Sequence, residues 1–505
     1  MNKNEYYRNK VEAFNEPERL VESVPLPGNP KKFHIIGICG TAMGALAGLL
    51  RDKGYEVSGS DQACFPPISD MLETLDVDVH TGNYEALNIA EDVDITVIGN
   101  VSTPKNPEAA HVRENNLPFT TLPDTLRDYV FGDAKRIVVA GTHGKTTTTG
   151  IVTALFDTAK KNPGFMIGGV PQGKEKGFSV GNGDYAIFEG DEYDTSYFNK
   201  MPKFLQYGAH TGIVTSLELD HLDIYSDLED YTQAFNYFAQ DIPKDGFLFI
   251  NGDDDVLTHL KDEAKQCMVR TYGFNDSNDI YGKYMRTTPQ GTQVCTVVVD
   301  GEELGEIETP LPGLYNIANC LGALGIALVH GISFEDIQKG LRIFGGMKRR
   351  QEVVCEVNGI TLIDDFAHHP TSVKATLAGI KEKYAQSETP RRLVAIFEPR
   401  SNSSRKKIFE KDYVTSFDSA DVVFLKTPKL RHNDDADDFI SPEAIKAGIL
   451  ARNENAQVFT HENVDALAED IMSTVKEGDI VMMMSNGNFD GLKGKLEEGL
   501  KEKKA

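Results

Sequence analysis

The segment 137–150, with the sequence IVVAGTHGKTTTTG, constrains the fold of this chain more than any other. Its first four residues are apolar and predict a buried strand, and the apolar positions after Lys145 predict a helix. Gly141 and Gly144 bracket the turn between them, where backbone N–H groups can approach an anion. Lys145 supplies a cation, and the hydroxyl group of Thr146 suits Mg²⁺. Strand, glycine turn and helix together predict a phosphate-binding loop.

This turn is shorter than the general phosphate-loop pattern G-x-x-x-x-G-K-[ST], which requires glycine where Val139 stands. The alternative is an ordinary strand-to-helix turn with an incidental lysine. The complete strand–turn–helix context favours the phosphate-binding interpretation.

A second glycine-rich turn comes earlier in the chain. Residues 33–38 predict a strand, the glycines at 37, 40 and 44 predict a turn into an apolar helix, and a second predicted strand ends at Asp61. This order is typical of a dinucleotide-type βαβ unit, although G-x-x-G-x-x-x-G departs from the usual G-x-G-x-x-G. With a further predicted strand at 95–98, it indicates an α/β nucleotide-binding domain.

Two acidic clusters follow predicted strands after the phosphate loop. The strand at 185–188 leads into the cluster 189–194, and the strand at 212–217 leads into the cluster 218–223, which contains His221. Ligands bind at the carboxyl ends of strands in open parallel sheets. The clusters therefore predict a divalent cation shared with a nucleotide, and the alternative for each is a solvated acidic loop.

A predicted helix at 314–330 follows a segment, 268–309, whose partial alternation predicts antiparallel strands. Asn316 and Asn319 are three residues apart and share one face of this helix. A buried amide needs a hydrogen-bond partner. A purine edge would serve, and so would the backbone of a neighbouring loop.

A third α/β unit is predicted after the basic run 347–350, with strands at 360–363, 393–397 and 480–484. The first of these strands leads into Asp364 and Asp365, and then into the adjacent pair His368 and His369. Adjacent histidines suggest zinc, but no further ligand stands at metal-binding spacing, so the sequence argues against a zinc site.

The composition limits the partners and the compartment. The formal net charge of −25 disfavours binding to nucleic acid or to an anionic membrane. The six cysteines form no C-x-x-C pair, which predicts buried, reduced thiols in a cytoplasmic protein. No apolar run approaches the length of a membrane span, and the N-terminus lacks the apolar core of a signal peptide. The oligomeric state stays open.

Taken together, these stretches resemble the Mur ligase family. The family's loop pattern G-T-x-G-K-[ST]-[ST] matches residues 141–147, and further similar stretches follow in the family's order at 37–44, 191–194, 364–370, 398–402 and 484–487. The resemblance implies an α/β fold with the three-domain Mur ligase architecture. It divides the chain into an N-terminal extension (1–30), a Rossmann-like UDP-sugar-binding domain (31–133), a central P-loop-type ATPase domain (134–345) and a Rossmann-like C-terminal peptide-binding domain (346–505).

The resemblance also implies an ATP- and Mg²⁺-dependent ligase of cell-wall peptidoglycan metabolism. Within the family, the motifs are most similar to those of the enzymes that join the murein tripeptide L-Ala-γ-D-Glu-meso-diaminopimelate to UDP-N-acetylmuramate during recycling. The addition of free L-alanine to the same nucleotide is the alternative within the family. From other classes, an NAD(P)H-dependent oxidoreductase and a catalytically inactive nucleotide sensor stay open.

The resemblance assigns site residues position by position. Lys145, Glu189 and His221 are expected to be catalytic, and Thr146, Glu189 and His221 to bind the metal ion. ATP is expected to contact Gly141, Thr142, His143, Gly144, Lys145, Thr146, Thr147, Asn316, Asn319, Arg349, Arg350, Asp364 and Asp365. The UDP-sugar is expected at Gly37, Gly40, Thr41, Met43, Gly44 and Asp61, and the peptide at Arg400, Ser401, Asn402, Ser485 and Asn486. Three stretches depart from the family pattern: Tyr315 replaces a usual His, Ser216 a frequent Asn, and Asn488-Phe489-Asp490 an expected Gly-Phe-Gly.

Overall fold

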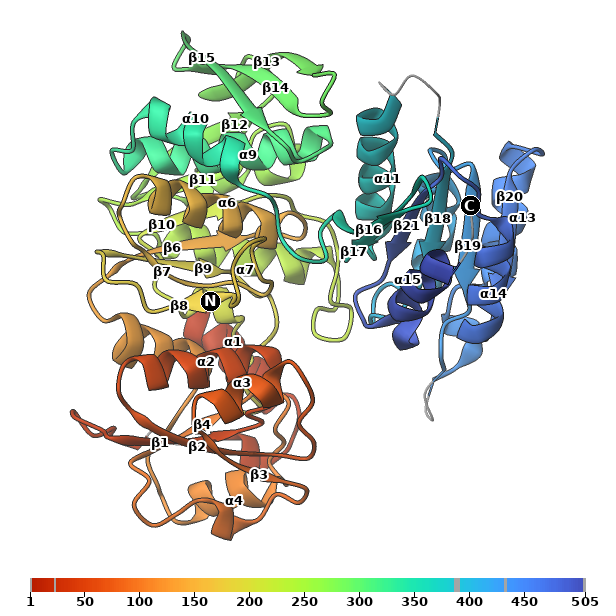
Figure 1. The fold of residues 1–505 in the computed structure, drawn as a ribbon. Coiled ribbons are helices and arrows are strands. Elements are labelled where there is room, and N and C mark those ends of the chain that lie inside the picture. Colours follow the sequence, from red (N-terminus) through yellow and green to blue (C-terminus); the bar gives the residue numbers. More distant parts are fainter. Residues whose placement is uncertain (1, 22–23, 386–390, 431–433, 503–505) are drawn as a thin grey trace.

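Three β-sheets follow one another along the chain in this computed structural model (Figure 1). The structure describes residues 2–21, 24–385, 391–430 and 434–502. The first sheet and its helices form one lobe, the second sheet forms the largest lobe, and the third sheet lies to one side of the second. Within the described residues, no helix combines the length and the apolarity that crossing a membrane requires.

The first sheet has five parallel strands in the order β3-β2-β1-β4-β5. Its strands are β1 (Lys32–Ile36), β2 (Glu56–Asp61), β3 (Asp78–Thr81), β4 (Ile95–Ile98) and β5 (Phe119–Thr120), and its helices are α2 (Thr41–Asp52), α3 (Ile68–Thr74), α4 (Pro107–Glu114) and α5 (Leu122–Thr125). The predicted strand–turn–helix–strand order over 33–61 is confirmed.

The second sheet has ten strands in the order β15-β14-β13-β12-β11-β10-β6-β9-β7-β8. The strands are β6 (Lys135–Ala140), β7 (Gly164–Met166), β8 (Phe178–Ser179), β9 (Tyr185–Glu189), β10 (Thr211–Val214), β11 (Phe247–Asn251), β12 (Met268–Gly273), β13 (Ile280–Thr287), β14 (Gln293–Val299) and β15 (Glu302–Thr309). The helices are α6 (Lys145–Thr158), α7 (Leu228–Asp241), α8 (Leu260–Glu263), α9 (Leu314–Val329) and α10 (Phe334–Ile343). Within the predicted antiparallel segment 268–309, β13, β14 and β15 pair antiparallel. The prediction is wrong for β12, which pairs parallel with β11 and β13 and extends the central sheet.

The central strands of this sheet are apolar on both faces because helices cover both. On β6, Ile137 and Val139 belong to the core that contains residues of α6 and α9, whereas Val138 and Ala140 belong to the core that contains residues of α7. Alternate residues of a strand point to opposite faces, so a continuous apolar run is what a doubly covered strand needs. This arrangement fixes where β6 ends and where the following turn lies.

The third sheet has six strands in the order β16-β17-β21-β18-β19-β20, with only β16 antiparallel to its neighbour among the described strand pairs. The strands are β16 (Glu352–Val357), β17 (Ile360–Asp365), β18 (Leu393–Phe397), β19 (Val422–Lys426), β20 (Gln457–His461) and β21 (Ile480–Met484). The helices are α11 (Pro370–Ala385), α12 (Glu410–Ser416), α13 (Pro442–Arg452), α14 (Val464–Thr474) and α15 (Leu492–Glu502). α11–α13 pack on one face and α14 and α15 on the other.

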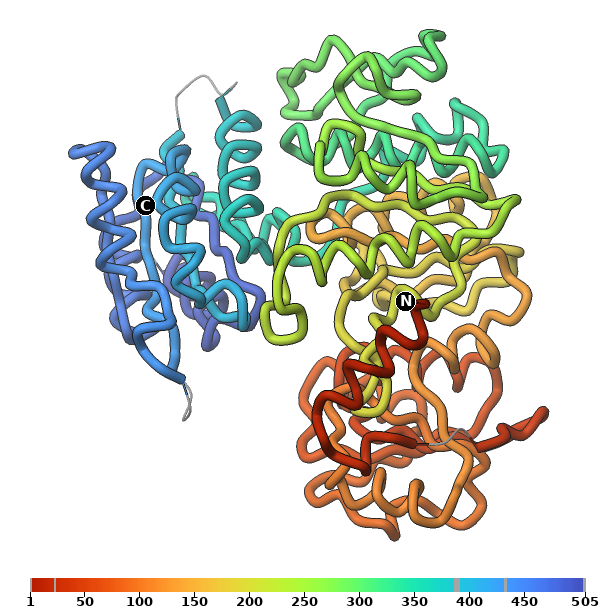
Figure 2. Tube along the Cα trace, turned by 180° about the vertical axis from the view of Figure 1, so that it is seen from behind, coloured from red at the N-terminus to blue at the C-terminus, as the bar shows by residue number. Residues whose placement is uncertain are grey.

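The N-terminal segment contains a helix, α1 (Lys3–Glu12), that runs from the edge of the second lobe across the first lobe, on the face turned toward the viewer in Figure 2. Tyr7 and Val11 are buried. The hydroxyl group of Tyr6 donates to Asp230 of α7 (2.5 Å), and Lys10 pairs with the same carboxylate. The segment that precedes the first sheet is thus attached to the second lobe.

Candidate active site

A cavity of about 530 Å³ opens at the carboxyl edge of the second sheet. Its walls come from the loops after β6, β9 and β10, from α9, and, on the opposite side, from the segment around Arg350 and from the residues between β17 and α11. The cavity therefore lies between the second and third sheets, in agreement with the rule that ligands bind beyond the carboxyl ends of parallel strands.

The turn after β6 requires glycine at both ends. Gly141 has φ +124° and Gly144 has φ +83°, in the region that L side chains rarely adopt. A Cβ atom on Gly141 would lie 2.3 Å from Oγ1 of Thr215, and one on Gly144 would lie 2.7 Å from Oδ1 of Asn319. The backbone of the turn is thus packed closely against two neighbouring elements.

The loop after β10 anchors this turn. The N–H of Thr142 donates to the carbonyl of Ser216 (3.0 Å), and the N–H of His143 donates to the Ser216 hydroxyl group (2.9 Å). The Thr142 hydroxyl group donates to the carbonyl of Glu218 (2.9 Å). Serine at 216, where the family often has asparagine, therefore still holds the loop. α6 begins directly after the turn, so its unpaired N–H groups lie at an anion-binding position.

Lys145 lies in the cavity wall and is held by three oxygen atoms. Its Nζ donates to the carbonyls of Gly141 (2.6 Å) and Thr142 (3.1 Å) and pairs with Oε1 of Glu192 (2.6 Å). The Glu192 side chain is only 1% exposed. Glu192 belongs to the predicted acidic cluster 189–194 but was not among the predicted site residues. Its place inside the stretch 191–194 was the signal that could have identified it.

His221 also faces Glu192. Its Nε2 lies 3.7 Å from Oε2 of Glu192, and its backbone has φ +53°. Burial alone would lower the pKa of His221, but the contact of its ring with the Glu192 carboxylate and the negative charges of Asp220 and Glu192 raise it above its ordinary value. The structure thus pairs His221 with Glu192 and not with Glu189.

Thr146 and Glu189 contact each other directly, so both can reach one metal ion. The Thr146 hydroxyl group donates to Oε1 of Glu189 (2.6 Å), and the N–H of Gly168 donates to Oε2 (2.6 Å). A hydroxyl and a carboxylate oxygen are hard oxygen ligands of the kind that Mg²⁺ prefers. These two residues therefore fit the expected ion beside the phosphate loop.

Arg349 and Arg350, which the sequence did not distinguish, point to different places. Nη2 of Arg350 donates to the Thr146 hydroxyl group (3.1 Å), across the boundary between the second and third lobes. Nη2 of Arg349 donates instead to the carbonyls of Ser485 (2.8 Å) and Gly487 (2.5 Å). Arg350 lines the cavity, whereas Arg349 is hydrogen-bonded to the loop after β21.

The neighbouring aspartates divide in the same way. Asp365 lines the cavity and accepts hydrogen bonds from the N–H groups of Gln351 (2.7 Å) and Ala367 (2.6 Å). Burial raises its pKa to about 6, although the positive charge of Arg350 opposes this shift. Asp364 faces Arg349 (3.6 Å) and lies outside the cavity wall.

Asn316 and Asn319 are buried and line the same cavity. Nδ2 of Asn319 donates to Oδ1 of Asn316 (3.2 Å), and Nδ2 of Asn316 donates to the carbonyl of Pro312 (2.8 Å). A loop backbone therefore satisfies one amide, as the second interpretation expects, whereas contact with a purine edge stays a prediction for these two cavity-lining side chains. The nearby Tyr315 accepts from Nε2 of Gln351 (2.5 Å).

The predicted UDP-sugar residues lie at the first sheet, away from this cavity. The turn between β1 and α2 contains Gly37, with φ +82°, and Oδ2 of Asp61 accepts from the N–H of Cys39 in that turn (2.9 Å). A Cβ atom on Gly44 would lie 2.9 Å from Ile68 of α3, so this glycine allows close helix packing. Gly40, Thr41 and Met43 belong to the same turn and helix start.

The prediction that all six cysteines are reduced is wrong in this structure. Cys39 and Cys64 form a disulfide bond, while Cys267, Cys295, Cys320 and Cys355 are free. The two bonded residues are 25 apart in sequence but follow the adjacent parallel strands β1 and β2. The ends of the two strands meet at one sheet edge, which the spacing of the cysteines did not reveal. Two of the free thiols, Cys267 and Cys355, are only partly buried.

The predicted peptide residues lie on the third sheet at the ends of the adjacent strands β18 and β21. The Ser485 hydroxyl group donates to the buried Glu398 (2.6 Å), and Asn402 donates to Asp223 of the second lobe (2.9 Å). Arg400 lies 3.4 Å from Oδ1 of Asn488. Ser401 and Asn486 belong to the same two loops, so the structure groups all five residues without placing them in the cavity wall.

The fold and this cavity define a three-lobed α/β protein with a phosphate-binding loop. Family models match the chain in three consecutive parts: the Mur ligase family catalytic domain at residues 32–130, the Mur ligase middle domain at 139–327, and the Mur ligase glutamate ligase domain at 349–487.

Individual relatives agree with these matches. The UDP-N-acetylmuramate–L-alanyl-γ-D-glutamyl-meso-2,6-diaminoheptandioate ligase of Escherichia coli is 36% identical over 474 residues, which cover 94% of this chain and 99% of the relative. The UDP-N-acetylmuramate–L-alanine ligase of Geotalea daltonii is 33% identical over 479 residues, covering 94% and 99%. The crystal structure of a murein peptide ligase from Psychrobacter arcticus superimposes with a TM-score of 0.68 at 30% identity and covers 94% of this chain and 100% of its own. The chain belongs to the Mur ligase family, whose members are ATP-dependent enzymes that form carbon–nitrogen bonds.

Proposed function

We propose that this enzyme joins the tripeptide L-Ala-γ-D-Glu-meso-diaminopimelate to UDP-N-acetylmuramate in peptidoglycan recycling. The observation that carries the proposal is the match over almost the whole chain to the E. coli ligase named for this reaction. The cavity supports it, because a phosphate loop on the second lobe faces an arginine from the third. We also propose the domain division 31–133, 134–345 and 346–505, and a cytoplasmic location, where ATP and nucleotide sugars are available.

The proposed reaction has two steps. The lactyl carboxylate of UDP-N-acetylmuramate attacks the γ-phosphorus of ATP, so that an acyl phosphate forms and ADP leaves. The α-amine of the tripeptide then attacks the acyl carbon, an amide bond forms, and inorganic phosphate and a proton are released. Because an acyl phosphate hydrolyses readily, the site must exclude water while the amine approaches. The position of the cavity between two lobes suits that requirement.

The residues of the chain position the phosphates and balance their charge. We propose that the turn 141–144 and the start of α6 hold the β- and γ-phosphates, with Lys145 and Arg350 on either side. Lys145 would exchange part of its contact with Glu192 for the phosphate oxygens. Thr146 and Glu189 would hold Mg²⁺, which neutralises charge on the transferred phosphoryl group when bound. His221, on the neighbouring loop, would affect Lys145 indirectly through its contact with Glu192.

Asp365 and the asparagine pair would bind the nucleoside part of ATP. Of the neighbouring Asp364 and Asp365, only Asp365 lines the cavity. Asn316 and Asn319 line the same cavity, and Asn319 lies beside the phosphate loop at Gly144. The glycine turn at 37–44 would hold the UDP-sugar, and the loops at 400–402 and 485–486 would hold the peptide.

The addition of L-alanine is the second candidate, because a ligase named for that reaction is almost as similar, at 33% identity. The direct test incubates the enzyme with ATP, Mg²⁺, UDP-N-acetylmuramate and the synthetic tripeptide, and detects products by mass spectrometry. The proposal requires the UDP-N-acetylmuramoyl-tripeptide together with one ADP per product. Formation of only UDP-N-acetylmuramoyl-alanine from a parallel L-alanine reaction would reject it.

A further inference from the structure

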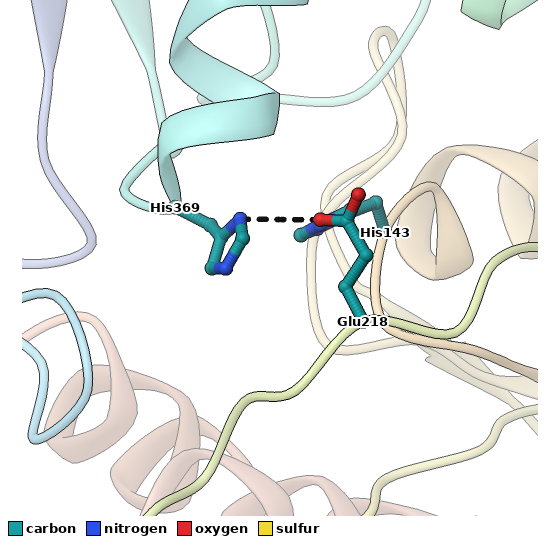
Figure 3. Close-up of side chains that lie close together, drawn as sticks. All are labelled: His143, Glu218 and His369. Carbon is teal, nitrogen blue, oxygen red and sulfur yellow. Dashed lines mark hydrogen bonds and ion pairs between the residues drawn. The ribbon is translucent and has the colours of Figure 1, made fainter. Parts of the chain in front are cut away.

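Three side chains from distant segments meet at the boundary between the second and third lobes (Figure 3). His143 lies in the phosphate-loop turn, Glu218 follows β10, and His369 directly precedes α11. Oε2 of Glu218 lies 2.8 Å from Nε2 of His143 and 3.4 Å from Nδ1 of His369. One nitrogen or oxygen atom from each residue lies within 4.8 Å of the other two.

The His369 ring is buried without a hydrogen bond. The residue is 7% exposed, and among the described residues neither of its ring nitrogens has a hydrogen-bond partner. Leaving a buried polar atom without a partner is unfavourable for folding. Figure 3 shows the ring directed at the Glu218 carboxylate. Nδ1 of His369 thus faces the Glu218 carboxylate at 3.4 Å without completing a hydrogen bond to it.

The chemistry of the three donors indicates a particular class of ion. Two imidazole nitrogens and one carboxylate oxygen suit Zn²⁺ and neighbouring divalent transition metals, whereas Mg²⁺ and Ca²⁺ prefer oxygen ligands alone. Ligands at tetrahedral Zn²⁺ are roughly 3.3–3.5 Å apart, given metal–ligand distances of about 2.0–2.2 Å. The contacts of 2.8 Å and 3.4 Å around Glu218 need only small adjustments to reach that spacing. The ligand nitrogens of the two histidines lie within 4.8 Å of each other and would move together on binding.

A second hydrogen bond orients one of the donors. Nδ1 of His143 lies 3.1 Å from the Ser372 hydroxyl group of α11, which leaves Nε2 directed at Glu218. Metal-binding histidines commonly use their other ring nitrogen in this way. Burial, with the charge of His143, lowers the pKa of His369, which favours the neutral ring that a metal ligand requires.

We propose that His143, Glu218 and His369 form a binding site for a divalent transition-metal ion, represented by Zn²⁺, with water as the fourth ligand. Binding would displace the proton shared by His143 and Glu218 into solvent. Because His143 and Glu218 belong to the second lobe and His369 to the third, the ion ties the phosphate loop to α11. This site uses none of the atoms of the Thr146–Glu189 pair, and it does not depend on which peptide the enzyme uses.

The spacing of residues along the sequence does not show that these three side chains meet. The adjacent histidines at 368 and 369 were rejected as a zinc site because no third ligand stands nearby in sequence. The fold separates them: Nδ1 of His368 lies 3.1 Å from the carbonyl of Phe366, while His369 meets partners from positions 143 and 218. His368 is therefore a matched control, as a neighbouring histidine outside the cluster.

The test uses the metal-stripped full-length protein and ZnCl₂ alone, by calorimetric titration without nucleotide. The proposal expects one Zn²⁺ per chain and a rise in melting temperature on binding. His369→Ala and the nearly isosteric Glu218→Gln should each weaken binding by at least about tenfold. His368→Ala and His221→Ala should bind as the wild type does. With Co²⁺ in place of Zn²⁺, the visible absorption of a tetrahedral site should appear in the wild type and be absent in His369→Ala.

Three outcomes would overturn the proposal. The first is no saturable Zn²⁺ binding by the wild-type protein. The second is wild-type affinity for Zn²⁺ in both His369→Ala and Glu218→Gln. Glu218→Gln keeps the size and shape of the side chain, so it decides the question if His369→Ala fails to fold. The third is loss of binding in His221→Ala alone, which would place the ion at the other histidine of the cavity.

Discussion

Nζ of Lys145 and Oε1 of Glu192 form an ion pair at 2.6 Å, with the two side chains 14% and 1% exposed. Oε2 of the same carboxylate lies 3.7 Å from Nε2 of His221. Glu192 therefore connects the lysine of the phosphate loop to the histidine of the second acidic cluster. Its negative charge is buried and depends on these partners, because an unpaired buried charge is strongly unfavourable.

Removing the lysine should affect both activity and stability. In Lys145→Ala, the phosphate loop loses its cation and Glu192 loses its main partner. We expect no measurable turnover and a loss of about 3–5 kcal/mol in the free energy of unfolding. Phosphate release and urea unfolding measure the two effects separately.

The double variant Lys145→Ala/Glu192→Gln serves as the control for this prediction. Neutralising Glu192 removes the unpaired charge, so stability should recover in part while turnover stays absent. Equal stability of the wild type and Lys145→Ala would show that the ion pair contributes little.

Arg350 should matter for turnover far more than its exposed neighbour Lys348. The Arg350 guanidinium reaches the Thr146 hydroxyl group from the third lobe, where it can stabilise charge on the transferred phosphoryl group. We expect Arg350→Ala to lower kcat by about 10²–10³-fold. Lys348→Ala, at an exposed position in the same basic run, should change kcat less than about twofold. Similar kcat values for the two variants would contradict the assignment.

The buried carboxyl group of Asp365 predicts a specific dependence of stability on pH. Its pKa of about 6 in the folded state exceeds the value of about 3.9 for an unfolded aspartate. As the pH falls below 6, the folded state takes up a proton before the unfolded state does, so this group favours folding increasingly down to about pH 4. Relative to Asp365→Asn, the wild type should gain about 2–3 kcal/mol between pH 7.5 and pH 4. If urea titrations show that the free energies of unfolding of the wild type and Asp365→Asn change in parallel with pH, the raised pKa of Asp365 is disproved.

The cysteine arrangement predicts a thiol count. Under denaturing conditions without reductant, four thiols should react with a chromogenic disulfide reagent, because Cys39 and Cys64 are bonded. After reduction, six should react. Peptide mapping should find the bond between these two cysteines. Six reactive thiols before reduction would restore the original prediction.

The sequence was sufficient for features that depend on local patterns. The strand predicted at 137–140 and the helix predicted from Lys145 follow from an apolar run, two glycines and helical spacing, and the structure has them as β6 and α6. The predicted strand at 212–217 ends earlier, at Val214, because the following residues leave the sheet to anchor the phosphate loop. Extended backbone and apolar composition alone do not reveal that change.

Other features depend on the fold as a whole. Arg349 has φ +58° and Gln351 has φ +52°, and this backbone sends Arg349 and Arg350 in different directions. The pairing of Glu192 with both Lys145 and His221 requires three loops to converge at one sheet edge. The cysteine pair and the His143–Glu218–His369 cluster have the same origin. Each joins residues that are distant in sequence, so no local pattern could have identified them.

The most direct test of the proposed function compares initial rates of phosphate release with different amine substrates. The enzyme is supplied with ATP, Mg²⁺ and UDP-N-acetylmuramate, and then with either L-Ala-γ-D-Glu-meso-diaminopimelate or L-alanine at equal concentration. The proposal predicts that kcat/KM for the tripeptide greatly exceeds the value for L-alanine, and that release depends on UDP-N-acetylmuramate. A higher kcat/KM for L-alanine than for the tripeptide would contradict the proposal. Phosphate release that requires neither UDP-N-acetylmuramate nor an amine substrate would also contradict it.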